Sequence, residues 1–236
     1  MSRTRAAALA AIFIVIAAAA FALTREKRTQ SPGERPVLLY LSSLPILFGE
    51  DFSLDTPASP VLETLRTRFA LVPIDVTDPP SLAKGRLLFM AQPRAQPPEN
   101  LVALDDWVRR GGRAVLFADP VLEWPSGKPP TDPTGPPRSF ADTGLLGHWG
   151  VRLDAPDERG PARVRIEGRD VATLSPGVLN GGCRIENGGL IADCAIGKGR
   201  VIVVADADFL NVGGEAPEAA GNVAAIESLL DRLTSR

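Results

Sequence analysis

Short apolar runs alternate with amphipathic segments in the first half of the chain. A continuous apolar run of four to eight residues is typical of a strand that is buried on both faces. Such runs predict strands at residues 37–41, 71–75, 86–91 and 113–118. Apolar side chains recur at helical spacing in residues 59–69, and again from residue 98 to the glycine pair at 111–112. This order of strands and helices predicts a mostly parallel sheet with helices on its faces.

The second half of the chain has a different pattern. Residues 120–137 are so rich in proline and glycine that we expect an irregular loop there. A short helix is expected at residues 139–149. Residues 160–204 then predict an antiparallel β excursion, with short strands at 163–166, 171–174, 183–185 and 190–195. A final buried strand at 200–205 and an amphipathic helix at 217–233 end the chain.

The chain begins with a hydrophobic segment outside this α/β domain. Residues 6–23 are uninterruptedly apolar and are flanked by basic residues on both sides. Two interpretations remain open. The segment is long enough to serve as an uncleaved single-pass anchor in the inner membrane, or it is a signal peptide cleaved near Ala22, where small residues stand at positions 20 and 22. Residues 24–35 are polar and predict a linker, and either interpretation places residues 36–236 in the periplasm.

The composition of the chain limits the classes of partner and cofactor that it is expected to bind. The chain has 236 residues, of which 44% are hydrophobic and 23% are charged, and this is enough for one domain with a substantial core. A formal net charge of -2 gives no electrostatic reason to expect a nucleic-acid partner. Two cysteines and one histidine do not supply the four ligands of a usual metal site, so neither a metal nor a cofactor is expected.

The two cysteines flank a strong turn signal. Cys183 and Cys194 lie on either side of Gly188 and Gly189, and a hairpin centred on these glycines would place the two thiols opposite each other. A disulfide would then be possible in an oxidising periplasm, whereas a shifted register would separate the two residues. The alternative is that both cysteines are small buried apolar residues.

Polar residues follow several of the predicted strands. Asp119, Asp206 and Asp208 come after buried strands, and Ser42 follows the first one. Because ligands of open α/β sheets bind at the carboxyl ends of the strands, these side chains are candidates for binding a ligand or partner. The alternative is that each aspartate accepts hydrogen bonds from backbone amides of its own turn. Trp124 in the proline-rich loop either covers a ligand or docks a partner, or it packs back onto the domain.

Candidates for catalysis are few. His148 could act as an acid or base with Asp142 or Asp154, but no nucleophile accompanies it in the sequence, so a surface imidazole is the expected role. The strand at 113–118 leads into Asp119-Pro120, where a hydrolase would carry a nucleophile on a tight turn. We therefore expect no enzymatic activity and no catalytic residues.

Three motifs resemble a known family. The helix and strand around Trp107-Val108 and Ala118-Asp119-Pro120, the segment 145–151, and the terminal region 197–211 with Asn222 are similar to the glutamine-amidotransferase-like domain of ABC-transport auxiliary proteins, the GldG-like proteins. The resemblance covers most of residues 36–236. It implies a flavodoxin-like or class I glutamine-amidotransferase-like α/β fold, with a C-terminal antiparallel excursion and a preceding N-terminal hydrophobic helix. The amidotransferase cysteine is missing at the corresponding strand end, so no catalytic role carries over.

The resemblance also implies a function. The predicted protein is a membrane-anchored, non-catalytic, extracytoplasmic accessory or binding component of an ABC transport system, with the ATPase and permease subunits as its partners. Recognition would use the strand-end loops 42–58, 119–138 and 206–216. Two alternatives remain open, namely a hydrolase-like enzyme that uses the strand-end aspartates and a purely structural docking domain.

Overall fold

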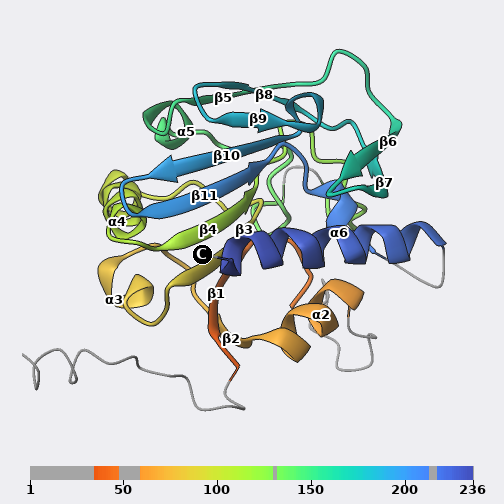
Figure 1. Cartoon of the computed structure of the whole chain (residues 1–236). Coiled ribbons are helices and arrows are strands. Elements are labelled where there is room, and N and C mark those ends of the chain that lie inside the picture. The colour runs from red at the N-terminus through yellow and green to blue at the C-terminus, as the bar shows by residue number, and fades with distance from the viewer. Residues whose placement is uncertain (1–34, 48–58, 130–131, 213–216, 236) are drawn as a thin grey trace, which may run out of the picture. The chain divides into compact units, whose positions relative to one another are not determined.

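The apolar runs of the first half of the chain become adjacent parallel strands (Figure 1). The computed structural model describes residues 35–47, 59–129, 132–212 and 217–235, and residues 36–236 form one compact unit. The parallel strands are β1 (Val37–Ser42), β2 (Ala70–Pro73), β3 (Leu87–Ala91), β4 (Arg113–Phe117) and β11 (Gly199–Val204). Hydrogen-bonded neighbours in the seven-stranded sheet follow the order β2-β1-β3-β4-β11-β10-β9.

Two antiparallel strands complete the sheet. Strand β10 (Ile191–Ile196) pairs with β11 on one side and with β9 (Arg184–Glu186) on the other. The turn η1 (Asn187–Gly189) joins β9 to β10, and its Gly188 and Gly189 have φ angles of 67° and 99°, a region that glycine adopts at little cost. Arg184 pairs with Asp193, so the next position of this ladder brings Cys183 opposite Cys194. The two cysteines form a disulfide with a Cα–Cα distance of 4.9 Å.

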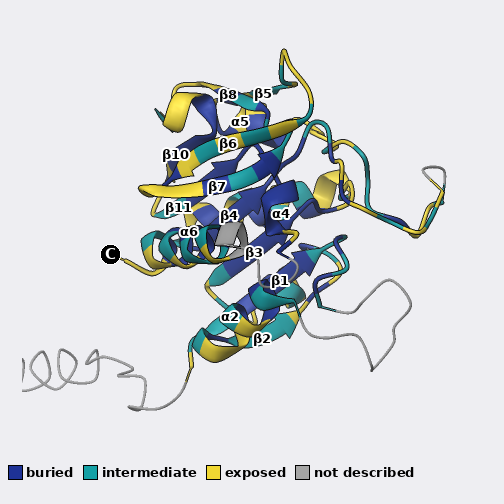
Figure 2. Ribbon diagram, turned by 90° about the vertical axis from the view of Figure 1, so that its right-hand side faces the viewer, coloured by how far each residue is buried: buried dark blue, intermediate teal, exposed yellow. Residues whose placement is uncertain are grey.

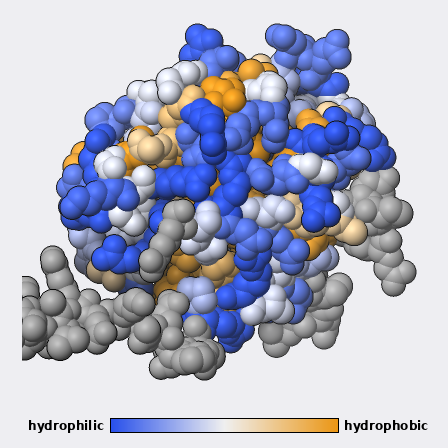
Figure 3. Space-filling model, viewed as in Figure 1, coloured by the Kyte–Doolittle hydropathy of each residue, from blue (hydrophilic) through white to orange (hydrophobic). Residues whose placement is uncertain are grey.

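One face of the sheet is covered by α2 (Pro60–Arg68), α6 (Pro217–Thr234) and the paired strands β6 (Pro161–Ile166) and β7 (Arg169–Leu174) (Figure 1). Leu65 of α2 and Leu229 of α6 are fully buried against this face, together with Phe89 and Phe117 of the sheet. Figure 2 shows the central strands of the sheet largely in the dark blue of buried residues. On the outer side, seen in Figure 3, polar side chains predominate and apolar ones form only small areas.

The opposite face is covered by α3 (Pro79–Leu82), α4 (Pro98–Arg109), α5 (Leu145–His148) and the paired strands β5 (Val151–Asp154) and β8 (Val178–Gly181). The indole of Trp107 on α4 donates a hydrogen bond to the Gly85 carbonyl at 3.2 Å. A Cβ atom at Gly112 would lie 2.3 Å from that indole, so only glycine fits where the chain passes beneath the ring. Gly111 ends the helix with a φ angle of 108°.

The predicted fold class is wrong. We expected a flavodoxin-like or amidotransferase-like sheet that is mostly parallel, with an antiparallel excursion beside it. The structure instead has a mixed seven-stranded sheet with few helices, and β9 and β10 belong to that main sheet. Residues 151–181 supply two further two-stranded sheets that cover its faces. Strands β5 and β8 and the short helix α3 were not predicted, and the helix expected at 139–149 is limited to Leu145–His148.

The predictions for the N-terminus concern residues that the structure does not describe. The hydrophobic helix at 6–23, the cleavage site near Ala22 and the linker at 24–35, except for Arg35, all lie outside the described ranges. Within those ranges, no helix has the length and apolar character needed to cross a bilayer.

A cluster of charges holds α6 against strands β9 and β10. The carboxylate of Asp193 on β10 accepts hydrogen bonds from Arg184 and Arg232 at 2.6 Å each, and from Nε of Arg200 at 2.7 Å. Arg232 of α6 also pairs with Glu186 at 2.8 Å and with Glu167. Burial alone would raise the pKa of Asp193, but the three guanidinium groups outweigh it and hold that pKa well below its usual range.

We predict that Asp193→Ala lowers the free energy of unfolding by about 3 kcal/mol, because it leaves partly buried guanidinium groups without their shared carboxylate. Denaturant unfolding at neutral pH measures the change. The control is Asp106→Ala on α4, whose pair with Arg110 is exposed and is expected to contribute no more than about 0.5 kcal/mol. Equal losses in the two variants would contradict the prediction.

Candidate functional site

The carboxyl ends of the parallel strands form one edge of the sheet. The connection after β1 leads to its neighbour β2, whereas the connection after β3 leads to β4, in the opposite direction along the strand order. The topological switch point therefore lies between β1 and β3. In open α/β sheets, a crevice at such a point is the usual place for a ligand. The residues that leave the strands at this edge include Ser42, Gln92, Asp119 and Asp206.

Asp119 links the loop after β4 to the loop after β11. Its side chain is fully buried, and its two oxygens accept hydrogen bonds from the backbone amides of Val121 at 2.8 Å and Ala207 at 2.9 Å. The carboxylate therefore fixes the paths of two loops. This geometry fits the interpretation in which Asp119 accepts hydrogen bonds from backbone amides of the turns.

Gln92 holds the other side of Asp119. Its amide nitrogen donates to the carbonyls of Asp119 at 3.0 Å and Pro137 at 3.1 Å, and its side-chain oxygen accepts from the Asp119 amide at 2.9 Å. Gln92 is fully buried and has a φ angle of 43°, which is uncommon for a residue other than glycine. Gln92 was not among the residues predicted from the sequence. The only available signal was a polar residue directly between an apolar strand and a proline.

Asp206 and Asp208 lie beside Asp119, as predicted from their positions after β11. Asp206 accepts from the Thr173 hydroxyl at 2.6 Å and from the Phe209 amide at 3.1 Å. Asp208 begins the 3-10 turn η2 (Asp208–Leu210), and its Oδ2 accepts from the Glu123 amide at 2.8 Å. Its Oδ1 is buried and has no hydrogen-bond partner among the described residues.

The surroundings of these three carboxyls raise the pKa of each one above the usual range of an aspartate. Burial, opposed by backbone hydrogen bonds, raises the pKa of Asp119 to about 6. Burial, with the nearby Asp119 charge as a further cause, raises the pKa of Asp206 well above its usual range and that of Asp208 to about 7. No group of His, Cys, Asp and Glu side chains in the described ranges is arranged to hold a metal ion.

Trp124 is buried rather than exposed. Only 6% of its surface is accessible, and it packs with Leu122 into the core on the α2 and α6 face. Arg138 fixes the loop around it, because the Arg138 side chain donates to the Trp124 carbonyl at 2.9 Å and its carbonyl accepts from the Leu122 amide at 2.9 Å. The alternative in which this tryptophan packs back onto the domain fits the structure, and its ring offers no free face to a ligand.

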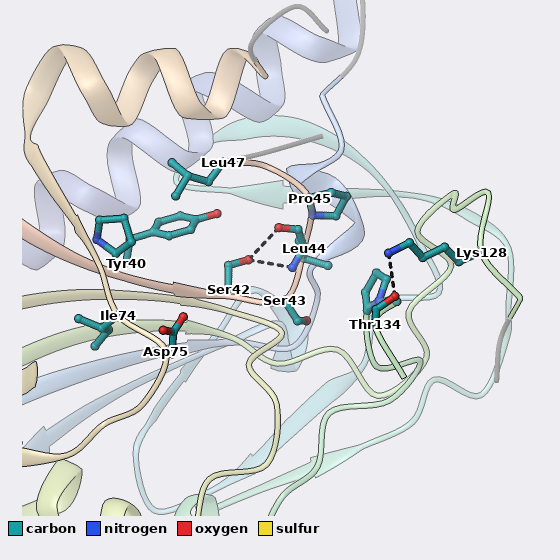
Figure 4. Close-up of a pocket in the computed structure, with 13 residues that line it drawn as sticks. Tyr40, Ser42, Ser43, Leu44, Pro45, Leu47, Ile74, Asp75, Lys128 and Thr134 are labelled. Atoms are coloured by element: carbon teal, nitrogen blue, oxygen red, sulfur yellow. Dashed lines mark hydrogen bonds between the residues drawn. The ribbon is translucent and has the colours of Figure 1, made fainter. Parts of the chain in front are cut away.

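Ser42 lines a cavity of about 230 Å³ beside the switch point, at the carboxyl ends of β1 and β2 (Figure 4). The cavity lies between the segment that follows β1, the end of β2 and the proline-rich loop. The residues around it are Tyr40, Ser42, Ser43, Leu44, Pro45, Leu47, Pro73, Ile74, Asp75, Lys128, Thr134, Gly135 and Pro136. The Ser42 hydroxyl accepts a hydrogen bond from the Leu44 amide at 3.0 Å, which turns the chain over the cavity.

His148 is far in the fold from this edge. It lies at the end of α5, 59% exposed, and its Nε2 is 3.3 Å from the carboxylate of Asp105 on α4 rather than beside Asp142 or Asp154. The Trp149 indole donates to the same carboxylate at 2.9 Å and Arg109 donates to it at 2.7 Å. These contacts tie α5 to α4 and bring no hydroxyl or thiol to the imidazole among the described side chains.

We predict that Asp208→Asn stabilises the protein at neutral pH. The folded-state pKa of Asp208 is raised, so its contribution to stability is present below about pH 4 and is lost as the pH rises to about 7. The amide keeps the oxygen that accepts from Glu123 and removes the charge. We expect a gain of about 2 kcal/mol at pH 7.5, no gain at pH 4, and a smaller pH dependence of unfolding.

Chemical denaturation between pH 4 and pH 7.5 measures this difference. Asp157→Asn is the matched control, since Asp157 is exposed. A variant at position 208 that follows the wild-type pH dependence would show that Asp208 ionises in the folded protein as readily as in the unfolded chain.

Several solved structures share this fold at low sequence identity. The structure of an exo-beta-1,4-mannosidase from Opitutaceae bacterium strain TAV5 is similar over 86% of this chain, with a TM-score of 0.53 and 15% sequence identity. The chain spans only 36% of that enzyme. It also matches the mmIFT52 N-terminal domain at 11% identity, over 85% of this chain and 99% of that one, with a TM-score of 0.53. The cytoplasmic protein STM1381 from Salmonella typhimurium LT2 is similar at 12% identity and a TM-score of 0.53, over 84% and 100% of the two chains.

The family of the chain follows from its sequence. No curated protein matches it at a significant level. Residues 31–157 match a family described as ABC-type uncharacterized transport system, which supports the transport part of the predicted resemblance and does not extend to an amidotransferase-like domain. This match covers more than half of the 236 residues, and the chain therefore belongs to the family of auxiliary components of these uncharacterized ABC transport systems.

Proposed function

We propose that this protein is a membrane-anchored, non-catalytic, extracytoplasmic binding component of its ABC transport system. Its partners would be the permease and ATPase subunits, and the loops at the carboxyl edge of the sheet would contact the part of the permease that is exposed to the periplasm. The proposal assigns to residues 6–23 the role of a single-pass anchor in the inner membrane. Cleavage near Ala22 and release into the periplasm is the alternative for that segment.

The observation that carries the proposal is the set of hydrogen bonds that the polar side chains at the strand ends make. Both oxygens of Asp119 bind backbone amides, Asp206 binds an amide and a hydroxyl, and Gln92 joins two of the loops. Hydrogen bonds of this kind hold loops in fixed positions, and fixed loops lower the conformational entropy lost on binding. This geometry favours a recognition surface over a set of acid and base groups.

The disulfide supports the extracytoplasmic part of the proposal. Cys183 and Cys194 are joined across the ladder between β9 and β10. Disulfides persist in oxidising compartments such as the bacterial periplasm and are rare in the cytosol. An extracytoplasmic position for residues 36–236 is consistent with an anchor or a signal peptide ahead of them.

One observation favours the hydrolase-like alternative. Asp208 has a buried oxygen without a partner and a pKa raised to about 7, as a general acid or base requires. However, its one hydrogen bond among the described residues is to a backbone amide, and no hydroxyl, thiol or imidazole is bonded to it there. The binding role therefore agrees better with the contacts of the edge.

We predict that the full-length protein, extracted from membranes in a mild detergent, co-purifies with an ATPase and a permease. Pro133 is an exposed residue of the proline-rich loop at the carboxyl edge. We expect Pro133→Glu to reduce the recovered subunits roughly tenfold if this edge is central to the interface. Val102→Glu is the matched control, because Val102 is a 64% exposed apolar residue on α4. Recovery of a free monomer from wild-type membranes would contradict the proposal.

We also predict that residues 36–236 face the periplasm. Proteinase K added to spheroplasts is expected to degrade this domain, whereas intact cells protect it. An anchored chain remains in the membrane pellet after an alkaline wash, and a cleaved chain appears in the periplasmic fraction. Protection of the domain in spheroplasts with intact inner membranes would refute the predicted topology.

A further inference from the structure

The cavity beside the switch point has the position and the size of a small-ligand site. It opens at the carboxyl ends of β1 and β2, and its volume of about 230 Å³ equals that of roughly eight water molecules in the liquid. It is smaller than the usual pocket for a drug-sized molecule, so any occupant is a small metabolite rather than a large one. Apolar groups form much of its wall, namely Leu44, Leu47 and Ile74 (Figure 4).

Tyr40 supplies a polar group that the fold itself does not use. Only 4% of the residue is exposed, and its hydroxyl has no hydrogen-bond partner among the described residues. Figure 4 shows the hydroxyl pointing toward the cavity, beside Leu44 and Leu47. Leaving a buried hydroxyl unbonded is unfavourable, so a ligand that bonds to it gains affinity.

The nearby serine hydroxyls donate to backbone carbonyls, and no described side chain accepts a hydrogen bond from Tyr40. The Ser42 hydroxyl is bonded to the amide and carbonyl of Leu44 at 3.0 and 3.4 Å. The Ser43 hydroxyl donates to the Gln92 carbonyl across the switch point. Burial raises the pKa of Tyr40 to about 12, with the nearby Ser42 hydroxyl opposing it more weakly, so the phenol is neutral and acts as a hydrogen-bond donor at physiological pH.

Lys128 adds a positive charge to the same cavity. Its ammonium donates to the Thr134 hydroxyl at 2.8 Å, and no carboxylate lies within ion-pair distance of it in the described part of the chain. Thr134 in turn donates to Asp132, so the loop positions the lysine beside the opening of the cavity. The Tyr40 and Lys128 donors thus belong to a wall that also holds apolar side chains, serine hydroxyls and the exposed carboxylate of Asp75.

We propose that this cavity binds a small organic carboxylate with a branched or linear apolar tail. The carboxylate would accept a hydrogen bond from the Tyr40 hydroxyl, the positive charge of Lys128 on the other side of Leu44 would favour an anion, and the tail would pack on Leu44, Leu47 and Ile74. Charge-assisted hydrogen bonds of this kind are stronger than neutral ones and would orient the ligand. The inference rests on the proposed binding function of the carboxyl edge, for which it names a ligand class.

The test compares 4-methylpentanoate with its neutral isostere 4-methylpentanamide, using calorimetry on the full-length protein in detergent. We expect saturable binding of the carboxylate at millimolar or lower concentration and at least roughly tenfold weaker binding of the amide. Tyr40→Phe is expected to weaken carboxylate binding roughly three- to tenfold, and Lys128→Met roughly tenfold. Lys84→Met, at an exposed lysine in the loop after α3, is expected to leave the affinity unchanged.

Several results would overturn the inference. These are no saturable binding of the carboxylate, equal binding of the amide, or an equal loss in the Lys84 control. The melting temperature of Tyr40→Phe is a second readout, because removing an unbonded hydroxyl should leave it unchanged or raise it. A fall would show that the fold itself uses the hydroxyl. Co-purification with transporter subunits alongside any of these failures would leave the proposed function standing and remove only this ligand.

Discussion

Burial of the central strands on both faces is the constraint on which the structure depends. Leu38 and Leu39 of β1, and Leu88 and Phe89 of β3, are all fully buried although neighbouring side chains in a strand point to opposite faces. The chain must therefore cover both faces of the sheet, and it does so with helices and with two pairs of short strands. Polar side chains are therefore excluded from the middle of these strands and are found directly after the strands end.

The polar groups at that end are used first to hold the fold together. The side chains of Asp119 and Gln92 join the loops after β3, β4 and β11 through the five hydrogen bonds described above, all of them to backbone groups. Because these groups are buried, each bond is worth more than it would be in water and each lost bond costs more. The loops that could recognise a partner are therefore supported from beneath, whereas the outer part of the proline-rich loop and the cavity wall remain accessible.

Much of the local structure could be predicted from the sequence, because continuous apolar runs and helical spacing have direct physical causes. The strands near residues 37, 86, 113 and 200, the close approach of the three aspartates and the opposed cysteines follow from such patterns. The sheet as a whole could not be predicted this way. The pairing of β10 and β9 with the main sheet, and of β5 with β8, depends on contacts between distant segments that leave no periodic signal.

The candidate site shows the same limit. Tyr40 stands inside an apolar run and was counted only as part of a strand, since nothing in the sequence distinguishes a bonded hydroxyl from an unbonded one. Gln92 is a single polar residue without a motif, and its importance comes from the two loops that meet around it. Trp124 looked exposed because proline and charge surround it in sequence, but Leu122 and Arg138 fold the loop inward.

The disulfide has a consequence for the outer border of the sheet. An uncovered terminal strand presents unpaired amides and carbonyls that can template pairing with another chain. Strand β9 has only three residues, Arg184 and Glu186 among them are charged, and the Cys183–Cys194 bond fastens its start to β10. At the other border β2 is four residues long and ends in a proline. Both borders are thus poor templates for strand addition, which protects a seven-stranded sheet from polymerising edge to edge.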